Sequence, residues 1–286
     1  MCDDEINPWL QADPAISRRA FGAGVGALAV LSAAEARAMA EVTAKDVVVK
    51  TADGEADAVL LYPAGKGTWP AVLIWTDILG LRPVFREMGR RLAAQGYVVL
   101  VPNPFYRSAK PAEYAGLNFG EPSGRQTLMG YRMAMPDAGV DNDAKAYLAF
   151  LDAQPQVDRK KPAGVQGYCM GGPLTFRTAA AVADRIGAAA TFHGGGLVTP
   201  QPNSPHLLVA KSKASYLVCV ARNDDARAPG DKEVLKKTFA DLNRPATVEV
   251  YGGDHGWTVR GSAVYNEAEA ERAWAELTKL YKARLG

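Results

Sequence analysis

Apolar positions along the chain follow two spacings that alternate with each other. Continuous apolar runs over residues 70–75 and 97–102 are typical of strands buried on both faces. Between them, residues 82–95 carry apolar side chains at helical spacing up to Gly96, a residue type common at helix ends. Because such segments alternate regularly, we predict a mostly parallel sheet covered by helices on both faces.

The same two patterns continue over most of the chain. Strands are also predicted over residues 46–51, 56–62, 163–167, 188–192, 215–221 and 246–251. Helices are also predicted over residues 140–151, 173–185, 232–242 and 265–285. A turn at Ala52-Asp-Gly separates the first two strands, which predicts a hairpin at the start of the domain.

The first forty residues have a different pattern. Arg18 and Arg19 precede an apolar run over residues 21–34, which is shorter than the roughly 20 residues needed to cross a bilayer. Ala36-Arg-Ala and Ala38-Met-Ala follow, and both have the small residues that signal peptidase requires. This order is typical of a twin-arginine export signal.

We therefore predict residues 1–40 to be an N-terminal tail with a signal peptide, and residues 41–286 to be one domain. Cleavage after Ala38 or Ala40 would follow passage through the export machinery. The mature protein would then be periplasmic or secreted, with no segment inserted in a membrane. The alternative is an ordinary amphipathic N-terminal helix on a cytoplasmic protein.

Composition narrows the classes of partner. The chain has 33 Lys and Arg against 31 Asp and Glu and no basic block, so we expect no nucleic-acid partner. Its three cysteines are too few and too scattered for a disulfide framework. Its cysteines and three histidines lack the spacing of a zinc site, so we expect no bound metal. We expect no organic cofactor, and a monomer or a small homo-oligomer.

Three loops that follow predicted strands carry residues capable of chemistry. Cys169 lies in the segment Gly-Tyr-Cys-Met-Gly-Gly, Asp224 and Asp225 follow the strand over 215–221, and His255 follows the strand over 246–251. In a parallel sheet these loops meet at the carboxyl ends of the strands, where reactive groups are found. The sequence therefore predicts that a thiol, a carboxylate and an imidazole converge.

The cysteine segment has the form of a nucleophile elbow, G-x-S-x-G, with a thiol in place of the hydroxyl. The start of the following helix favours a thiolate, and the N–H of Met170 would face the oxyanion formed on a substrate. His255 would exchange protons with the thiol, while a carboxylate orients its ring. Spacing alone does not choose between Asp224 and Asp225. The alternatives are a buried, inert Cys169 and His193 as the base.

Several segments together resemble the dienelactone hydrolase family, whose members are cysteine-dependent α/β-hydrolases that open lactones and esters. The similar segments are Trp75-Thr-Asp-Ile-Leu-Gly80, Gly167-Tyr-Cys-Met-Gly-Gly172, Ala221-Arg-Asn-Asp224 and His255-Gly-Trp257. The resemblance implies that Cys169 is the nucleophile, Asp224 the acid and His255 the base. It also implies an oxyanion hole formed by the N–H groups of Ile78 and Met170.

The resemblance extends less directly to other residues. The family places a Glu beside the resting cysteine, and Asp77 stands at that position here. Arginines bind carboxylate substrates in the family, which suggests substrate-binding roles for Arg125 and Arg260. His193 and Trp257 are expected to line the pocket.

We therefore expect hydrolysis of a small ester or lactone through an acyl-enzyme, as in a carboxymethylenebutenolidase. One alternative is a thiol-based redox protein centred on Cys169. The other is a binding module without activity, which would leave all three converging residues unused.

Overall fold

The computed structural model of the protein describes residues 41–286. The predicted export signal, its cleavage sites and the boundary at residue 40 lie outside the described residues. Within residues 41–286, no helix combines the length and the apolar character needed to cross a membrane.

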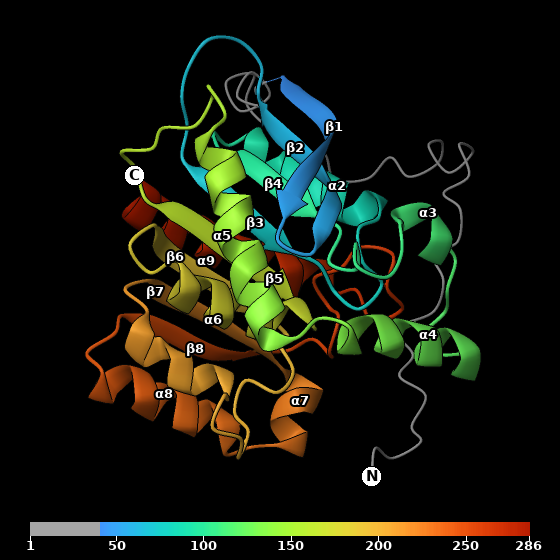
Figure 1. Ribbon diagram of the computed structural model, residues 1–286. Coiled ribbons are helices and arrows are strands. Elements are labelled where there is room, and N and C mark those ends of the chain that lie inside the picture. The colour runs from blue at the N-terminus through green and yellow to red at the C-terminus, as the bar shows by residue number, and fades with distance from the viewer. Residues whose placement is uncertain (1–40) are drawn as a thin grey trace, which may run out of the picture.

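The described part of the chain contains one sheet of eight strands in the order β1-β2-β4-β3-β5-β6-β7-β8 (Figure 1). The strands are β1 (Val42–Thr51), β2 (Gly54–Pro63), β3 (Ala71–Trp75), β4 (Val98–Pro102), β5 (Ala163–Tyr168), β6 (Ile186–Phe192), β7 (Ser215–Ala221) and β8 (Ala246–Tyr251). β1 and β2 form the predicted hairpin, and β2 pairs antiparallel with β4. All pairs from β4 to β8 are parallel, which confirms the predicted sheet.

The helices are α2 (Pro83–Ala93), α3 (Pro111–Tyr114), α4 (Pro122–Met133), α5 (Asp137–Asp152), α6 (Gly171–Ala181), the 3-10 helix η2 (Pro205–Lys211), α7 (Arg222–Arg227), α8 (Asp231–Asp241) and α9 (Glu267–Leu285). The predicted α2, α5, α6, α8 and α9 are confirmed. The segment after β7 was expected to be a loop and is the helix α7. Asp224 and Asp225 lie in its first turn, where carboxylates are stabilised by the positive end of a helix.

Helices cover both faces of the sheet, and each face has its own hydrophobic core (Figure 1). One core includes Tyr147 of α5 and Phe176 of α6, and the other includes Phe85 of α2 and Tyr281 of α9. Trp75 belongs to the first core, is fully buried and donates its indole N–H to Thr178 Oγ1 at 2.9 Å. The inner strands are therefore fixed from both sides, which holds their carboxyl ends in place.

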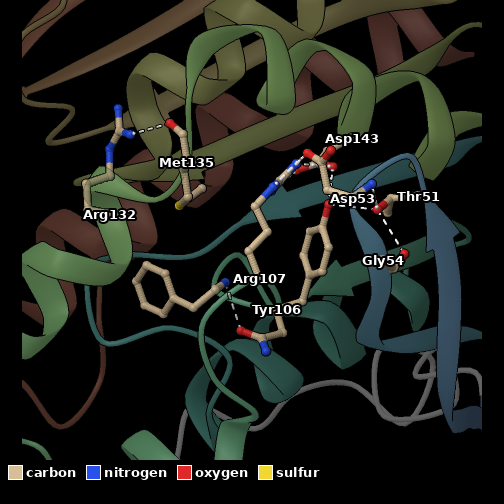
Figure 2. A network of polar contacts seen from close by, with 10 residues as sticks. Thr51, Asp53, Gly54, Tyr106, Arg107, Arg132, Met135 and Asp143 are labelled. Atoms are coloured by element: carbon tan, nitrogen blue, oxygen red, sulfur yellow. Dashed lines mark hydrogen bonds and ion pairs between the residues drawn. The ribbon is translucent and has the colours of Figure 1, made fainter.

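A buried charged network ties the β1–β2 hairpin to α5 (Figure 2). Arg107, in the loop after β4, binds both carboxylate oxygens of Asp143 on α5, at 2.7 and 2.9 Å, and also binds Asp53 in the hairpin turn. Tyr106 donates its hydroxyl to Asp143 at 2.7 Å and contacts Thr51 Oγ1. Asp143 is 1% exposed, so its charge depends on these partners.

Candidate active site

Cys169 directly follows β5 and has the backbone conformation of a nucleophile elbow. Its φ is +50°, a left-handed conformation that costs a non-glycine residue about 1–3 kcal/mol. A Cβ at Gly167 would lie 2.1 Å from the Gly171 oxygen, and a Cβ at Gly171 would lie 2.6 Å from the Trp75 oxygen. Both positions therefore require glycine, and the thiol between them is partly exposed.

The loop after β8 places His255 against α7. His255 Nδ1 lies 2.5 Å from Asp224 Oδ2, and the His255 N–H donates to Asn223 Oδ1 at 2.8 Å. Asp225 is directed elsewhere, because both its carboxylate oxygens lie 2.8 Å from Lys232 Nζ. Of the two neighbouring carboxylates, the structure brings only Asp224 to the imidazole.

The electrostatic surroundings of His255 link it to the thiol. Burial lowers the pKa of His255, but the thiolate of Cys169 and the hydrogen bonds to Asp224 and Cys169 raise it more, to about 10. The imidazole is therefore protonated at neutral pH when the sulfur is charged. Such a pair can supply both a nucleophile and a proton donor.

Replacing Cys169 by alanine should lower the pKa of His255 below the value of about 10, because the main contribution that raises it is lost. In the wild type the folded-state pKa of His255 lies above the ordinary 6.5, so protonated His255 stabilises the folded state. This contribution to the free energy of unfolding is complete below pH 6.5 and disappears as pH rises through about 10. NMR titration of the imidazole protons measures the change. His206 in η2 is the internal control, and an unchanged His255 titration would contradict the assignment.

The loop after β3 packs directly against the elbow. A Cβ at Gly171 would lie 2.7 Å from the Thr76 oxygen, so the two backbones are in contact. Ile78 lies on this loop, and Met170 is the N-cap residue of α6. In the described part of the chain, neither N–H donates to another backbone group. The two N–H groups are thus available for an oxyanion.

Asp77 forms a bidentate ion pair with Arg82. Both carboxylate oxygens accept hydrogen bonds from Arg82, at 2.5 and 2.8 Å, and Oδ1 also accepts from the Leu79 N–H at 2.9 Å. The Asp77 side chain is 4% exposed. These bonds fix the loop that carries Ile78, which is a role for Asp77 other than the expected one beside the resting cysteine. The sequence contained no signal for Arg82.

Tyr114 fixes the other end of this loop. Its hydroxyl accepts from the Leu81 N–H at 3.1 Å and donates to Asn103 Oδ1 at 2.9 Å. Its ring lies 2.8 Å from the position of a Cβ at Gly80, whose φ is +71°. A side chain at Gly80 would therefore displace the loop.

Replacing Arg82 by methionine should destabilise the protein by about 2–3 kcal/mol, because the buried Asp77 carboxylate would lose its counter-ion. Thermal denaturation measures this loss, and adding Asp77→Asn should restore most of it. Arg86→Met is the matched control, since Arg86 pairs with the exposed Asp46. A loss for Arg82→Met no greater than for Arg86→Met would disprove the proposed clamp.

The remaining predicted residues lie in three different surroundings. His193 and Trp257 are buried, and the His193 ring centroid lies 5.0 Å from that of His255 and 5.1 Å from that of Trp257. Arg260 lines a cavity of about 460 Å³ together with Arg82, Leu79 and residues 111–117. Arg125 lies on α4, stacks on Phe119 and is not among the residues lining this cavity.

The described residues contain no group of three or more His, Cys, Asp or Glu side chains that could hold a metal ion. Cys169 and Cys219 are both free thiols. Cys169, His255 and Asp224 offer the chemistry of a thiol, an imidazole and a carboxylate.

The family model of the dienelactone hydrolases matches residues 56–285. A Synechocystis protein assigned as a carboxymethylenebutenolidase is 24% identical over 230 residues, or 79% of this chain and 91% of the relative. The carboxymethylenebutenolidase of Rhodococcus opacus is 25% identical over 186 residues, or 65% of this chain and 68% of the relative. A Klebsiella pneumoniae crystal structure assigned as a dienelactone hydrolase has a TM-score of 0.73 at 23% identity, covers 85% of this chain and 99% of that chain, and confirms the α/β-hydrolase fold.

The family match, the parallel sheet and the elbow at Cys169 agree with one another. The chain belongs to the dienelactone hydrolase family and is a hydrolase acting on esters or lactones.

Proposed function

We propose that the protein hydrolyses a small ester or lactone, as a carboxymethylenebutenolidase does, through an acyl-enzyme on Cys169. The observation that carries this proposal is the strained, partly exposed thiol next to a buried imidazole that Asp224 holds at 2.5 Å. Asp224 fixes the ring and stabilises its positive charge. The remaining nitrogen of the ring, Nε2, is then the one that exchanges protons with sulfur and substrate.

The acylation step uses the thiolate as nucleophile. The Cys169 sulfur attacks the carbonyl carbon, and the π electron pair moves to oxygen, which the N–H groups of Ile78 and Met170 stabilise. The tetrahedral intermediate then collapses, the C–O bond to the alcohol breaks, and the leaving alkoxide takes the proton of His255. In a lactone this step opens the ring and leaves the alcohol attached to the acyl group.

The deacylation step reverses the roles of the proton donor. Neutral His255 removes a proton from water, and the resulting hydroxide attacks the thioester carbon. The C–S bond breaks, the acid is released and the thiolate again pairs with protonated His255. No oxidant, metal or cofactor is required for this balance.

The cavity lined by Leu79 and Arg260 favours a substrate with an anionic group, and neither Cys169 nor His255 is among its lining residues. Its wall is apolar at Leu79 and Leu117, and Arg260 supplies positive charge, since the charge of Arg82 is paired with Asp77. We propose that Arg260 binds a substrate carboxylate, because its side chain is 71% exposed and its ion pair with Glu267 is long, at 3.8 Å.

Mass spectrometry of the intact protein tests the acyl-enzyme directly. Quenching the reaction of a p-nitrophenyl ester with acid should reveal one added acyl group, mapped by peptide analysis to Cys169. Cys169→Ser at the same position is the matched variant, because it keeps the shape and replaces the sulfur. Turnover without any adduct on residue 169, over a panel of esters and lactones, would disprove the proposal.

The redox alternative lacks a suitable second thiol among the described residues. Cys219 is fully buried in β7, and burial raises its pKa to about 12, which keeps it protonated and unreactive. Export remains a proposal from residues 17–40 of the sequence alone.

A further inference from the structure

His193 occupies a strained position one strand away from the thiol. It follows β6, whose last residue, Phe192, pairs with Tyr168 of β5, and the Cys169 N–H donates to the Phe192 oxygen at 3.1 Å. The φ of His193 is +43°, so two adjacent strand ends both carry a non-glycine residue in the left-handed conformation. Strain of this kind persists only where the surrounding structure maintains it.

The surrounding structure is mainly the loop that carries His255. The His193 ring is edge-on to Trp257 at 5.1 Å between centroids and lies 5.0 Å from the His255 ring. Its Nε2 shares a hydrogen bond of 2.8 Å with Thr258 Oγ1. His193 therefore contacts three of the four residues from 255 to 258.

His193 is not placed to act as the base. Its Nε2 is occupied by Thr258, and Asp224 is bonded to His255 instead. Burial and the nearby charge of His255 hold the pKa of His193 well below its ordinary value, so the ring is neutral. A neutral ring can lie beside protonated His255 without the repulsion that a second cation would create.

We propose that His193 is a positioning residue, which holds His255 in reach of Cys169 by packing against its ring and by bonding Thr258. This inference rests on the proposed function, in which the imidazole must serve the sulfur and then a water molecule. In this role His193 acts through His255 and does not contact the substrate.

Two variants remove the hydrogen bond from its two sides. His193→Phe keeps a planar ring and removes the bond, and Thr258→Val removes only the hydroxyl. Each should lower kcat at least about tenfold while KM changes less than twofold, since a small displacement of His255 slows proton transfer but not binding. The double variant should be no slower than either single variant, because both remove one interaction.

Alkylation of Cys169 by iodoacetamide, followed by peptide mapping, provides a readout that does not depend on ester hydrolysis. The rate should fall in His193→Phe and in Thr258→Val, and His193→Gln, which can still bond Thr258, should recover part of it. Thr238→Val on α8 is the matched control, since its hydroxyl bonds only a helix carbonyl.

Two results would overturn the inference. One is alkylation of Cys169 in Thr258→Val at the wild-type rate. This variant keeps the test valid even where His193→Phe fails to fold. The other is a double variant whose loss equals the product of the two single losses. If Cys169 of the wild-type protein is alkylated rapidly but the protein hydrolyses no ester, that result would count against the proposed function alone.

Discussion

Replacing Cys169 by alanine should lower kcat/KM for a p-nitrophenyl ester by at least about 10,000-fold, because loss of a nucleophile leaves only binding and the oxyanion donors. The substitution removes one sulfur from a partly exposed position and keeps the glycines that shape the elbow. The fold should therefore remain intact, as judged by circular dichroism. Steady-state kinetics at substrate concentrations well below KM measure the loss.

Cys219→Ala is the matched control for this prediction. It removes the other described thiol, which is fully buried in β7, and should leave kcat/KM within a few fold of the wild type. Ester turnover that survives in Cys169→Ala would rule out this residue as the nucleophile. Equal losses in both variants would show that packing, rather than chemistry at Cys169, determines the rate.

Replacing Asp143 by alanine should destabilise the protein by about 3 kcal/mol, which corresponds to a decrease in Tm of about 6–12 °C. Asp143 is 1% exposed and accepts hydrogen bonds from Arg107 and Tyr106 (Figure 2). Without it, the Arg107 guanidinium remains largely buried with a single carboxylate partner, Asp53. Differential scanning calorimetry measures the effect.

Asp53→Ala removes the other partner of the same guanidinium and is the matched control. The Asp53 side chain is 43% exposed, so its ion pair is screened by water and its loss should cost less than about 1 kcal/mol. A similar cost for both variants would show that burial does not determine the strength of this network. Activity should be retained in Asp53→Ala, because the hairpin turn carries none of the site residues.

Most of the sheet could be predicted from sequence because its inner strands are buried on both faces. β3 and β4 contain only buried residues and therefore read as continuous apolar runs. α4 could not be predicted, since only Gly124 and Leu128 are buried while Met129 and Met133 are exposed, which leaves no apolar stripe. α7 has six residues and none is buried, so its pattern resembled a loop.

The candidate site was predictable to the extent that topology determines it. Parallel strands bring their carboxyl ends to one edge, so the motifs at Cys169 and His255 could be expected to meet. The choice of Asp224 over Asp225 depends on which way α7 turns, and spacing does not determine this. Arg82 reaches Asp77 only because the chain turns back at Gly80, and the left-handed backbone of His193 leaves no mark in the sequence.

The contact between Gly171 and the Trp75 carbonyl has a consequence for how the enzyme could acquire new substrates. A contact between two backbones offers no side chain that mutation can enlarge or reduce, so the elbow at Cys169 and the loop of Ile78 move as one body. We expect variation to enter instead through the cavity lined by α3 and residues 260–262. Libraries aimed at altered selectivity should concentrate there, and substitutions at the elbow glycines should yield insoluble protein instead of new specificity.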